Sequence, residues 1–319
     1  MILTCEHTKT ININQYDPSR TTGLRNSFAR DMAKRFRELI QVIRRAVIEQ
    51  DCFGLNRNLV SLQLTLPGHK AFDFPRSSDK VRSFMNWLKQ QVDKGMLEIR
   101  EVPQIGIAAE QAWTNVYITD SYKRGVIRAR YELQKAGFDN IPSIEQTGGI
   151  NISLNTPVHA DRLGLLYTHT FNDLKGITNA MDVQISRVLA QGIADGDNPR
   201  LLARKLVSTI NGTGMGELGI TDTLGRFVPA ASRADMLART EIIRAHAEAQ
   251  LIEYKNWAVE GVALKAEFVT AGDERVCSIC ESMQGQVFKL EEASGIIPVH
   301  PRCRCAWIPF KQSLITGRL

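Results

Sequence analysis

Five residues near the C-terminal end of the chain could bind a metal ion. Cys277 and Cys280 form a Cys-x-x-Cys pair, and the segment His300-Pro-Arg-Cys303-Arg-Cys305 follows it. A Cys-x-x-Cys turn places two thiolates on one side of a tight loop, and a second His/Cys cluster can complete the tetrahedral shell that zinc prefers. The spacing therefore predicts a small knuckle held together by a metal ion.

These five donors are one more than zinc needs. Cys303 and Cys305 flank a single residue, so an extended segment would point them to opposite sides, whereas His300 and Cys303 can share a turn. The predicted ligands are Cys277, Cys280, His300 and Cys303, with Cys305 as the alternate ligand. A closed shell of four protein ligands makes a structural site. The competing interpretation is a module held by reduced thiols or disulfides without metal.

The composition narrows the class of protein. Of 319 residues, 43% are hydrophobic and 23% charged, which is typical of a folded globular chain with two or three domains. No stretch approaches the 18–20 apolar residues of a membrane span, and the start of the sequence has no basic region followed by an apolar run. We therefore expect a protein that is made and folded in a cytoplasm, where paired cysteines are more often metal ligands than disulfides. Cys5 and Cys52 are expected to be unrelated single thiols.

The net charge of +6 is concentrated in one segment, because residues 20–45 contain eight basic residues and two acidic ones. A basic helix can face nucleic-acid phosphates or an acidic protein surface. The alternative is a solvated helix face. The candidate residues for binding DNA or a protein partner are Arg25, Arg30, Lys34, Arg35, Arg37, Arg44 and Arg45.

The spacing of apolar residues predicts long helices that would carry these groups. A mainly α fold with small α+β elements is expected, with long amphipathic helices and a small C-terminal Cys/His knuckle module. The predicted helices are 22–49, 78–95, 107–137, 161–191, 198–210 and 232–257, and the predicted strands are 60–66, 97–102 and 264–270. Turn-rich residues 138–160 mark the main boundary, so the expected domains are 1–150, 151–260 and 261–319.

Two further motifs resemble functional sites. Gly214-Met-Gly216-Glu-Leu-Gly219 has the spelling of a dinucleotide-binding loop, but a helix precedes it where a strand is required, so a connecting loop is expected. His246-Ala-Glu248 upstream of the Cys-x-x-Cys pair resembles a zinc deaminase signature. Residues i and i+2 of a helix point about 200° apart, so these two are expected to be surface residues.

Taken together, several motifs resemble the phage Mu F-like head morphogenesis family. These are Ala238-Arg-Thr-Glu241 on a long helix, Trp257 near its end, Thr270-Ala-Gly-Asp-Glu-Arg-Val-Cys-x-x-Cys, Gly285-x-Val-Phe288 and His300-Pro-Arg-Cys-Arg-Cys305. The resemblance covers about residues 161–310 and is most specific in the last seventy.

The resemblance implies a minor capsid protein of a tailed phage or prophage. Such a protein would be assembled in the host cytoplasm, reside in the virion near the portal vertex, and act in head assembly, with DNA packaging or ejection as further roles. Its implied partners are the portal protein and other capsid proteins, with DNA as a further candidate. The resemblance implies no enzymatic activity, and no membrane or small-molecule substrate is expected. The alternatives are a zinc-dependent nucleic-acid enzyme of the deaminase or nuclease type and a DNA-binding module.

Overall fold

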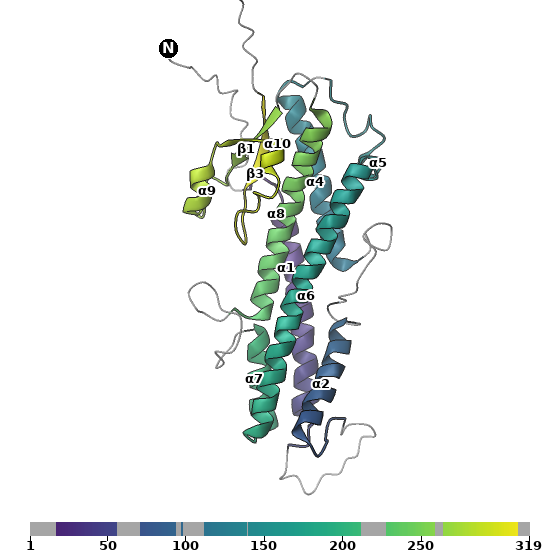
Figure 1. The fold of residues 1–319 in the computed structure, drawn as a ribbon, viewed down its shortest axis with the longest axis vertical. Coiled ribbons are helices and arrows are strands. Elements are labelled where there is room, and N and C mark those ends of the chain that lie inside the picture. Colours follow the sequence, from purple (N-terminus) through teal and green to yellow (C-terminus); the bar gives the residue numbers. More distant parts are fainter. Residues whose placement is uncertain are drawn as a thin grey trace, which may run out of the picture. The chain divides into compact units, whose positions relative to one another are not determined.

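A computed structural model describes residues 17–55, 71–93, 97, 112–138, 140–211, 228–258 and 264–311 (Figure 1). The strand predicted at 60–66 and the glycine motif at 214–219 lie outside the described residues. Only Leu97 of the strand predicted at 97–102 is described, and it lies in a bend. In the described part of the chain, no helix is both long enough and apolar enough to cross a membrane.

The described chain is mainly helical and has one small sheet, as the sequence predicts. The helices are α1 (Thr22–Arg44), the π-helical turn η1 (Arg45–Glu49), α2 (Ser77–Gln91), α4 (Trp113–Lys135), α5 (Ile150–Leu154), α6 (Pro157–Ala194), α7 (Pro199–Asn211), α8 (Ala230–Trp257), α9 (Ser278–Met283) and α10 (Leu290–Ala293). The strands are β1 (Leu264–Val269), β2 (Val287–Lys289) and β3 (Ala306–Lys311).

The chain forms two compact units, each built from separate stretches of sequence. Unit 1 comprises residues 1–28, 103–168 and 239–319, and unit 2 comprises residues 29–102 and 169–238. Helices α1, α6 and α8 therefore contribute residues to both units. The division at about residues 150 and 260 stays a prediction from the sequence.

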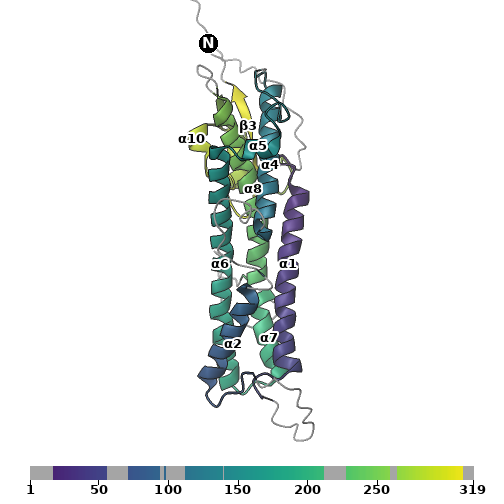
Figure 2. The ribbon, with the colours of Figure 1, turned by 90° about the vertical axis from the view of Figure 1, so that its right-hand side faces the viewer.

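Unit 1 joins the C-terminal sheet to helices α4 and α8. The sheet is antiparallel with the order β2-β1-β3, and Val269 pairs with Ala306 at one end of the β1/β3 ladder. Both ribbon views place the sheet beside α8 and α4 (Figures 1 and 2). Gln250 of α8 fixes the contact, because its side chain donates to the Trp307 carbonyl at 2.9 Å and accepts from the Trp307 N–H at 3.3 Å. The Trp307 side chain is fully buried in the core of this unit.

Helices α4 and α8 approach closely at a glycine. A Cβ placed on Gly125 would lie 2.5 Å from the backbone oxygen of His246 and 2.7 Å from the Cβ of Ala249. The hydroxyl of Ser121, one helical turn earlier, donates to the Ile242 carbonyl at 2.6 Å. Only a residue without a side chain allows this backbone separation.

Buried polar residues connect the same helices. Glu132 of α4 is 1% exposed and accepts from Tyr254 at 3.0 Å, from Gln250 at 3.3 Å, and from Arg128. Burial raises the pKa of Glu132 to about 7, although the neighbouring Arg128 and Tyr254 lower it. A buried carboxyl group with three donors satisfies the requirement that buried polar atoms be hydrogen-bonded.

Aromatic side chains of α2 and of two turns pack together in unit 2. Four aromatic rings, those of Phe53, Phe72, Phe84 and Trp87, pack with centroid separations of 5.1 to 6.1 Å. Aromatic pairs of this kind stabilise a fold by more than the burial of their apolar surface alone. Asn198 caps α7 by accepting from the Leu201 N–H at 3.0 Å, and Pro199 occupies the first helical position.

Candidate metal centre

The first two candidate ligands lie where a loop enters α9. Cys277 is the N-terminal cap of this helix, and its sulfur accepts from the backbone N–H of Cys280 at 3.4 Å. This hydrogen bond lowers the pKa of Cys277, because it stabilises the thiolate. The Cys-x-x-Cys turn therefore has the geometry predicted for it, with both sulfurs facing the same point.

His300 completes a first triad. Its Nε2 atom lies 3.2 Å from the sulfur of Cys277 and 3.2 Å from the sulfur of Cys280. Its Nδ1 atom lies 2.8 Å from the carbonyl oxygen of Pro301, which can only accept. Nδ1 is therefore the protonated nitrogen of the neutral ring, so the lone pair of Nε2 faces the two sulfurs. This is the tautomer in which a histidine binds a metal ion, with its second nitrogen held by a carbonyl.

Cys303 and Cys305 form a second triad with Cys280. Their sulfurs and that of Cys280 all lie within 4.8 Å of one another. The expectation that Cys303 and Cys305 face opposite ways is therefore wrong. A turn precedes the two cysteines, since Arg302 has a positive φ of 63° and the Cys303 N–H donates to the His300 carbonyl at 3.1 Å. Residues 303–305 lie between this turn and β3 and are not part of a strand, so the alternation expected of an extended segment does not apply to them.

The donor set suits zinc. In a tetrahedral site the usual Zn–N and Zn–S bond lengths put nitrogen and sulfur about 3.6 Å apart, close to the separations seen here. Burial raises the pKa of the Cys280 thiol to about 12 in a chain without metal, and the neighbouring Cys303 adds to this effect. A divalent cation reverses the balance, because it binds the thiolates directly. The arrangement can hold a metal, and all four predicted ligands lie in the cluster.

An ion pair that sequence reasoning missed joins the two ligand segments. Asp273 lies in the loop before Cys277, and Arg304 lies between Cys303 and Cys305. The guanidinium of Arg304 donates to both carboxylate oxygens of Asp273, one at 2.7 Å, and Arg275 also donates to Asp273, at 3.0 Å. These bonds hold the pKa of Asp273 well below its usual range. The alternation of arginine with cysteine in Cys303-Arg-Cys305 was the available signal.

His246 and Glu248 are not surface residues, so that expectation is wrong. Their exposed fractions are 1% and 5%. Helix α8 is covered on all sides here, since every residue from Glu241 to Gln250 is buried except the half-buried Arg244. Glu248 accepts from Arg162 of α6, with the Arg162 Nε at 3.1 Å, and from the Gly295 N–H at 3.1 Å. The carboxylate is thus engaged in packing and is not part of the Cys/His cluster in the described residues.

The candidate basic residues of α1, together with Arg45 at the start of η1, differ in exposure. Arg30, Lys34, Arg37, Arg44 and Arg45 are exposed, and we call these five the basic face. Spacings of four, three and seven between the first four place them on one side of the helix. Arg35 is half-buried, 3.9 Å from Asp31. Arg25 is buried, donates to Thr22 at 2.7 Å and pairs with Asp17 at 3.4 Å. Because it is buried and paired, its assignment as a residue that binds DNA or a partner is wrong.

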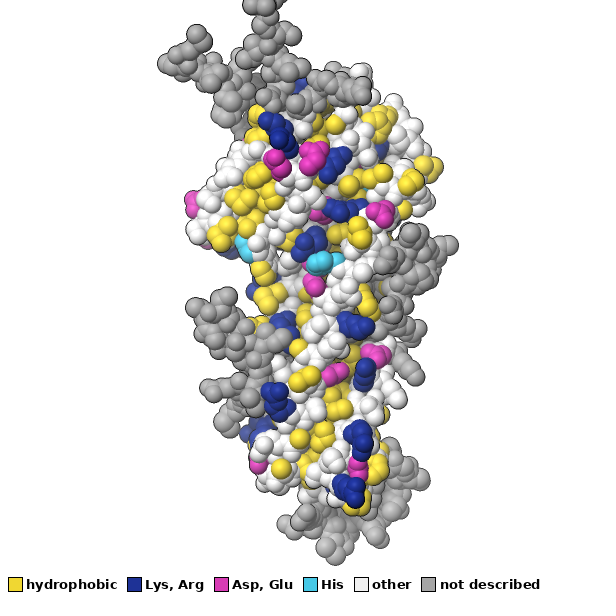
Figure 3. Space-filling view, viewed as in Figure 1, with side chains coloured by type: hydrophobic (Ala, Val, Ile, Leu, Met, Phe, Trp, Pro, Cys, Tyr) yellow, Lys and Arg dark blue, Asp and Glu magenta, His cyan; other side chains and the backbone are white. Residues whose placement is uncertain are grey.

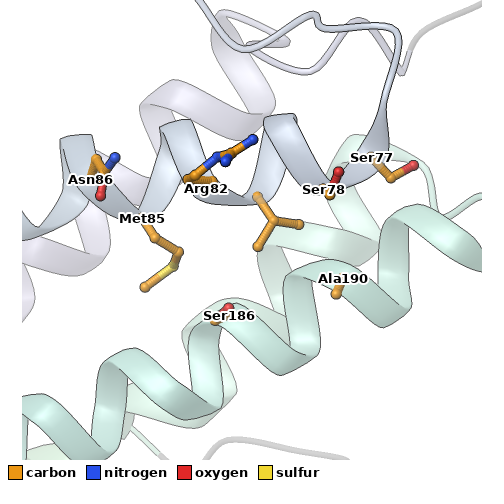
Figure 4. A pocket seen from close by; sticks show the side chains of 8 residues that line it. Ser77, Ser78, Arg82, Met85, Asn86, Ser186 and Ala190 are labelled. Atoms are coloured by element: carbon orange, nitrogen blue, oxygen red, sulfur yellow. The ribbon is translucent and has the colours of Figure 1, made fainter.

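A pocket lies within unit 2, between α2 and α6 (Figure 4). Its volume is about 530 Å³, and its walls are Ser77, Ser78, Val81, Arg82, Met85 and Asn86 of α2 with Ser186 and Ala190 of α6. Arg82 is the one ionisable residue in this lining, and it pairs with Asp79. General acid–base chemistry needs titratable groups within reach of a substrate, and this lining does not supply them.

A comparison with known families places the cluster in context. No curated protein and no solved structure matches the chain. The family described as phage Mu protein F like protein matches residues 183–308. The matched segment contains the last third of α6, all of α7, α8, β1 and β2, the first half of β3 and all five candidate ligands. The resemblance to the phage Mu F-like family is therefore confirmed, in that residues 183–308 are similar to this family.

Proposed function

We propose that the protein is a minor head morphogenesis factor of a tailed phage or prophage, located in the capsid near the portal vertex. The observation that carries this proposal is the family match over residues 183–308, which supports a phage head protein with other capsid proteins as partners. Its helical body would bind the portal protein, and it would act in head assembly and in DNA packaging or ejection. The role is structural rather than enzymatic.

The C-terminal module is proposed to be a rigid cap stapled by one zinc ion. Cys277, Cys280, His300 and one thiolate of the Cys303/Cys305 pair would hold it. With four protein ligands the ion has no open position for substrate or water, so it contributes to folding and not to catalysis. The sheet then presents a fixed structure to α8, because β3 is bonded to Gln250 at the position of Trp307.

The basic face of α1 is the proposed contact for DNA or for an acidic protein surface. Residues 22–49 carry seven basic side chains against three acidic ones, of which Glu49 lies 3.8 Å from Arg45 of the basic face. On the face drawn in Figure 3, by contrast, basic side chains are scattered among acidic and hydrophobic ones. If all five residues of the basic face contact phosphates, log K for DNA should fall with log salt with a slope of about −4 to −5.

The proposal is tested with the cognate portal protein. Co-expression should yield a complex that stays together on size-exclusion chromatography, and heads assembled without this protein should form poorly or deliver DNA poorly. A variant in which glutamates replace the five residues of the basic face tests the proposed contact. This variant should still fold but should lose DNA retention or portal binding. Normal heads in the absence of the protein, together with no portal complex at low salt, would refute the proposal.

A further inference from the structure

The Cys/His cluster offers five donors for four positions, and the structure distinguishes between the last two. We infer that Cys305, and not Cys303, is the fourth ligand of the metal centre, with Cys303 as a buried thiol behind the shell. This inference rests on the metal centre proposed above and reverses the order that the sequence favours for these two cysteines.

The space at the cluster is lined by Cys305 and not by Cys303. A cavity of about 20 Å³ lies at the cluster. This is room for about one water-sized sphere, which suits a single ion. Its lining contains four candidate ligands, Cys277, Cys280, His300 and Cys305, together with Ala271, Val276 and the arginines 275, 302 and 304. Cys303 is absent from the lining.

The register of the sheet also places Cys305 next to the loop that carries Cys277. Val269, the last residue of β1, pairs with Ala306, the first residue of β3. Cys305 directly precedes this pair, so it lies beside the point where β1 gives way to the loop that leads to Cys277. Ala271 of that loop lines the same cavity. The strand pairing therefore fixes Cys305 beside the first ligand segment.

Hydrogen bonds and strand pairing restrain the backbone near Cys305 on both sides. The backbone N–H of Cys303 is committed to the turn with His300, at 3.1 Å from its carbonyl oxygen. Arg304, which also lines the cavity, is fixed to Asp273 in the opposite loop. With Arg304 anchored toward the loop and β3 beginning at Ala306, the backbone at Cys305 is restrained on both sides. Arg304 is thus a positioning residue, and Cys305 is the thiol that it presents.

Cobalt(II) titration of the full-length reduced protein tests the inference, because the thiolate-to-cobalt charge-transfer band increases with the number of bound thiolates. The variants are Cys303→Ser and Cys305→Ser, with Cys277→Ser as a ligand control and circular dichroism as a check on folding. We expect Cys305→Ser and Cys277→Ser to lose about one third of the band, as when one of three thiolates is removed. Both should bind zinc on the order of 100-fold more weakly in competition with a chelator.

Cys303→Ser decides the question alone if Cys305→Ser fails to fold. A full band in this variant, with zinc affinity near that of the unmodified chain, supports Cys305 as the ligand. Loss of one third of the band in Cys303→Ser overturns the inference, whether or not Cys305→Ser also loses it. An unmodified chain that binds neither cobalt nor zinc refutes the metal centre itself, which is a different result from a bound metal with the other thiolate.

Discussion

Replacing Glu248 by alanine should destabilise the protein substantially. Glu248 is 5% exposed, and the change would leave Arg162 without its carboxylate and the Gly295 N–H without its acceptor. Breaking a buried ion pair costs about 3–5 kcal/mol. Because the Arg162 side chain is 28% exposed, water compensates in part, and we expect a cost below this range, about 2–3 kcal/mol. In a chain of this size the melting temperature should fall by roughly 3–5 °C.

The assay is urea unfolding followed by circular dichroism, supported by thermal scans. Glu248→Gln should have a smaller effect, because the amide oxygen can still accept from the Gly295 N–H while the charge is lost. The matched control is Glu292→Ala, since this carboxylate pairs with Lys289 at 3.4 Å on the surface and its side chain is 57% exposed. The control should change the free energy of unfolding by less than about 1 kcal/mol. If Glu248→Ala is as mild as Glu292→Ala, the buried contact between α6, α8 and the C-terminal module does not exist.

Three further predictions test other parts of the account. Gly125→Ala should cost about 1–3 kcal/mol in urea unfolding because its Cβ meets α8 backbone, whereas Gly176→Ala, with no atom within 4 Å, should be neutral or stabilising; equal effects would refute the close helix contact. Burial lowers the pKa of His246 to about 4, so the neutral ring stabilises the fold above pH 6.5 and this stability, up to about 3 kcal/mol, is lost as the pH falls toward 4. His246→Leu should flatten that dependence, and an unchanged pH profile would contradict it. Charge reversal at Arg30, Lys34 and Arg37 should leave the melting temperature nearly unchanged while weakening DNA or portal binding, and unchanged binding at low salt would show that the basic face is only solvated.

Local patterns predicted much of the helical framework. The apolar stripes of α1, α6 and α8 repeat at three and four residues, and the structure has helices over Thr22–Arg44, Pro157–Ala194 and Ala230–Trp257. The Cys-x-x-Cys turn was also predictable, because its geometry depends on four consecutive residues. These features depend on neighbours in the chain, which a sequence displays directly.

Long-range contacts were not predictable in this way. Glu248 looks like a surface residue until Arg162, 86 positions earlier, is placed beside it. The convergence of Cys303 and Cys305 depends on an irregular backbone between the turn at His300 and the start of β3, where the expectation from sequence assumed an extended segment. The ion pair between Asp273 and Arg304 joins residues 31 positions apart, and it can be recognised only once β1 and β3 are paired.

The most direct test of the stapled module is a zinc measurement on the full-length protein, purified without chelator. Elemental analysis should find about one zinc per chain, and removal of the ion should lower the melting temperature, because metal binding at such a site is part of the folding free energy. A protein that carries no zinc, and whose stability is the same with and without a chelator, would contradict the account.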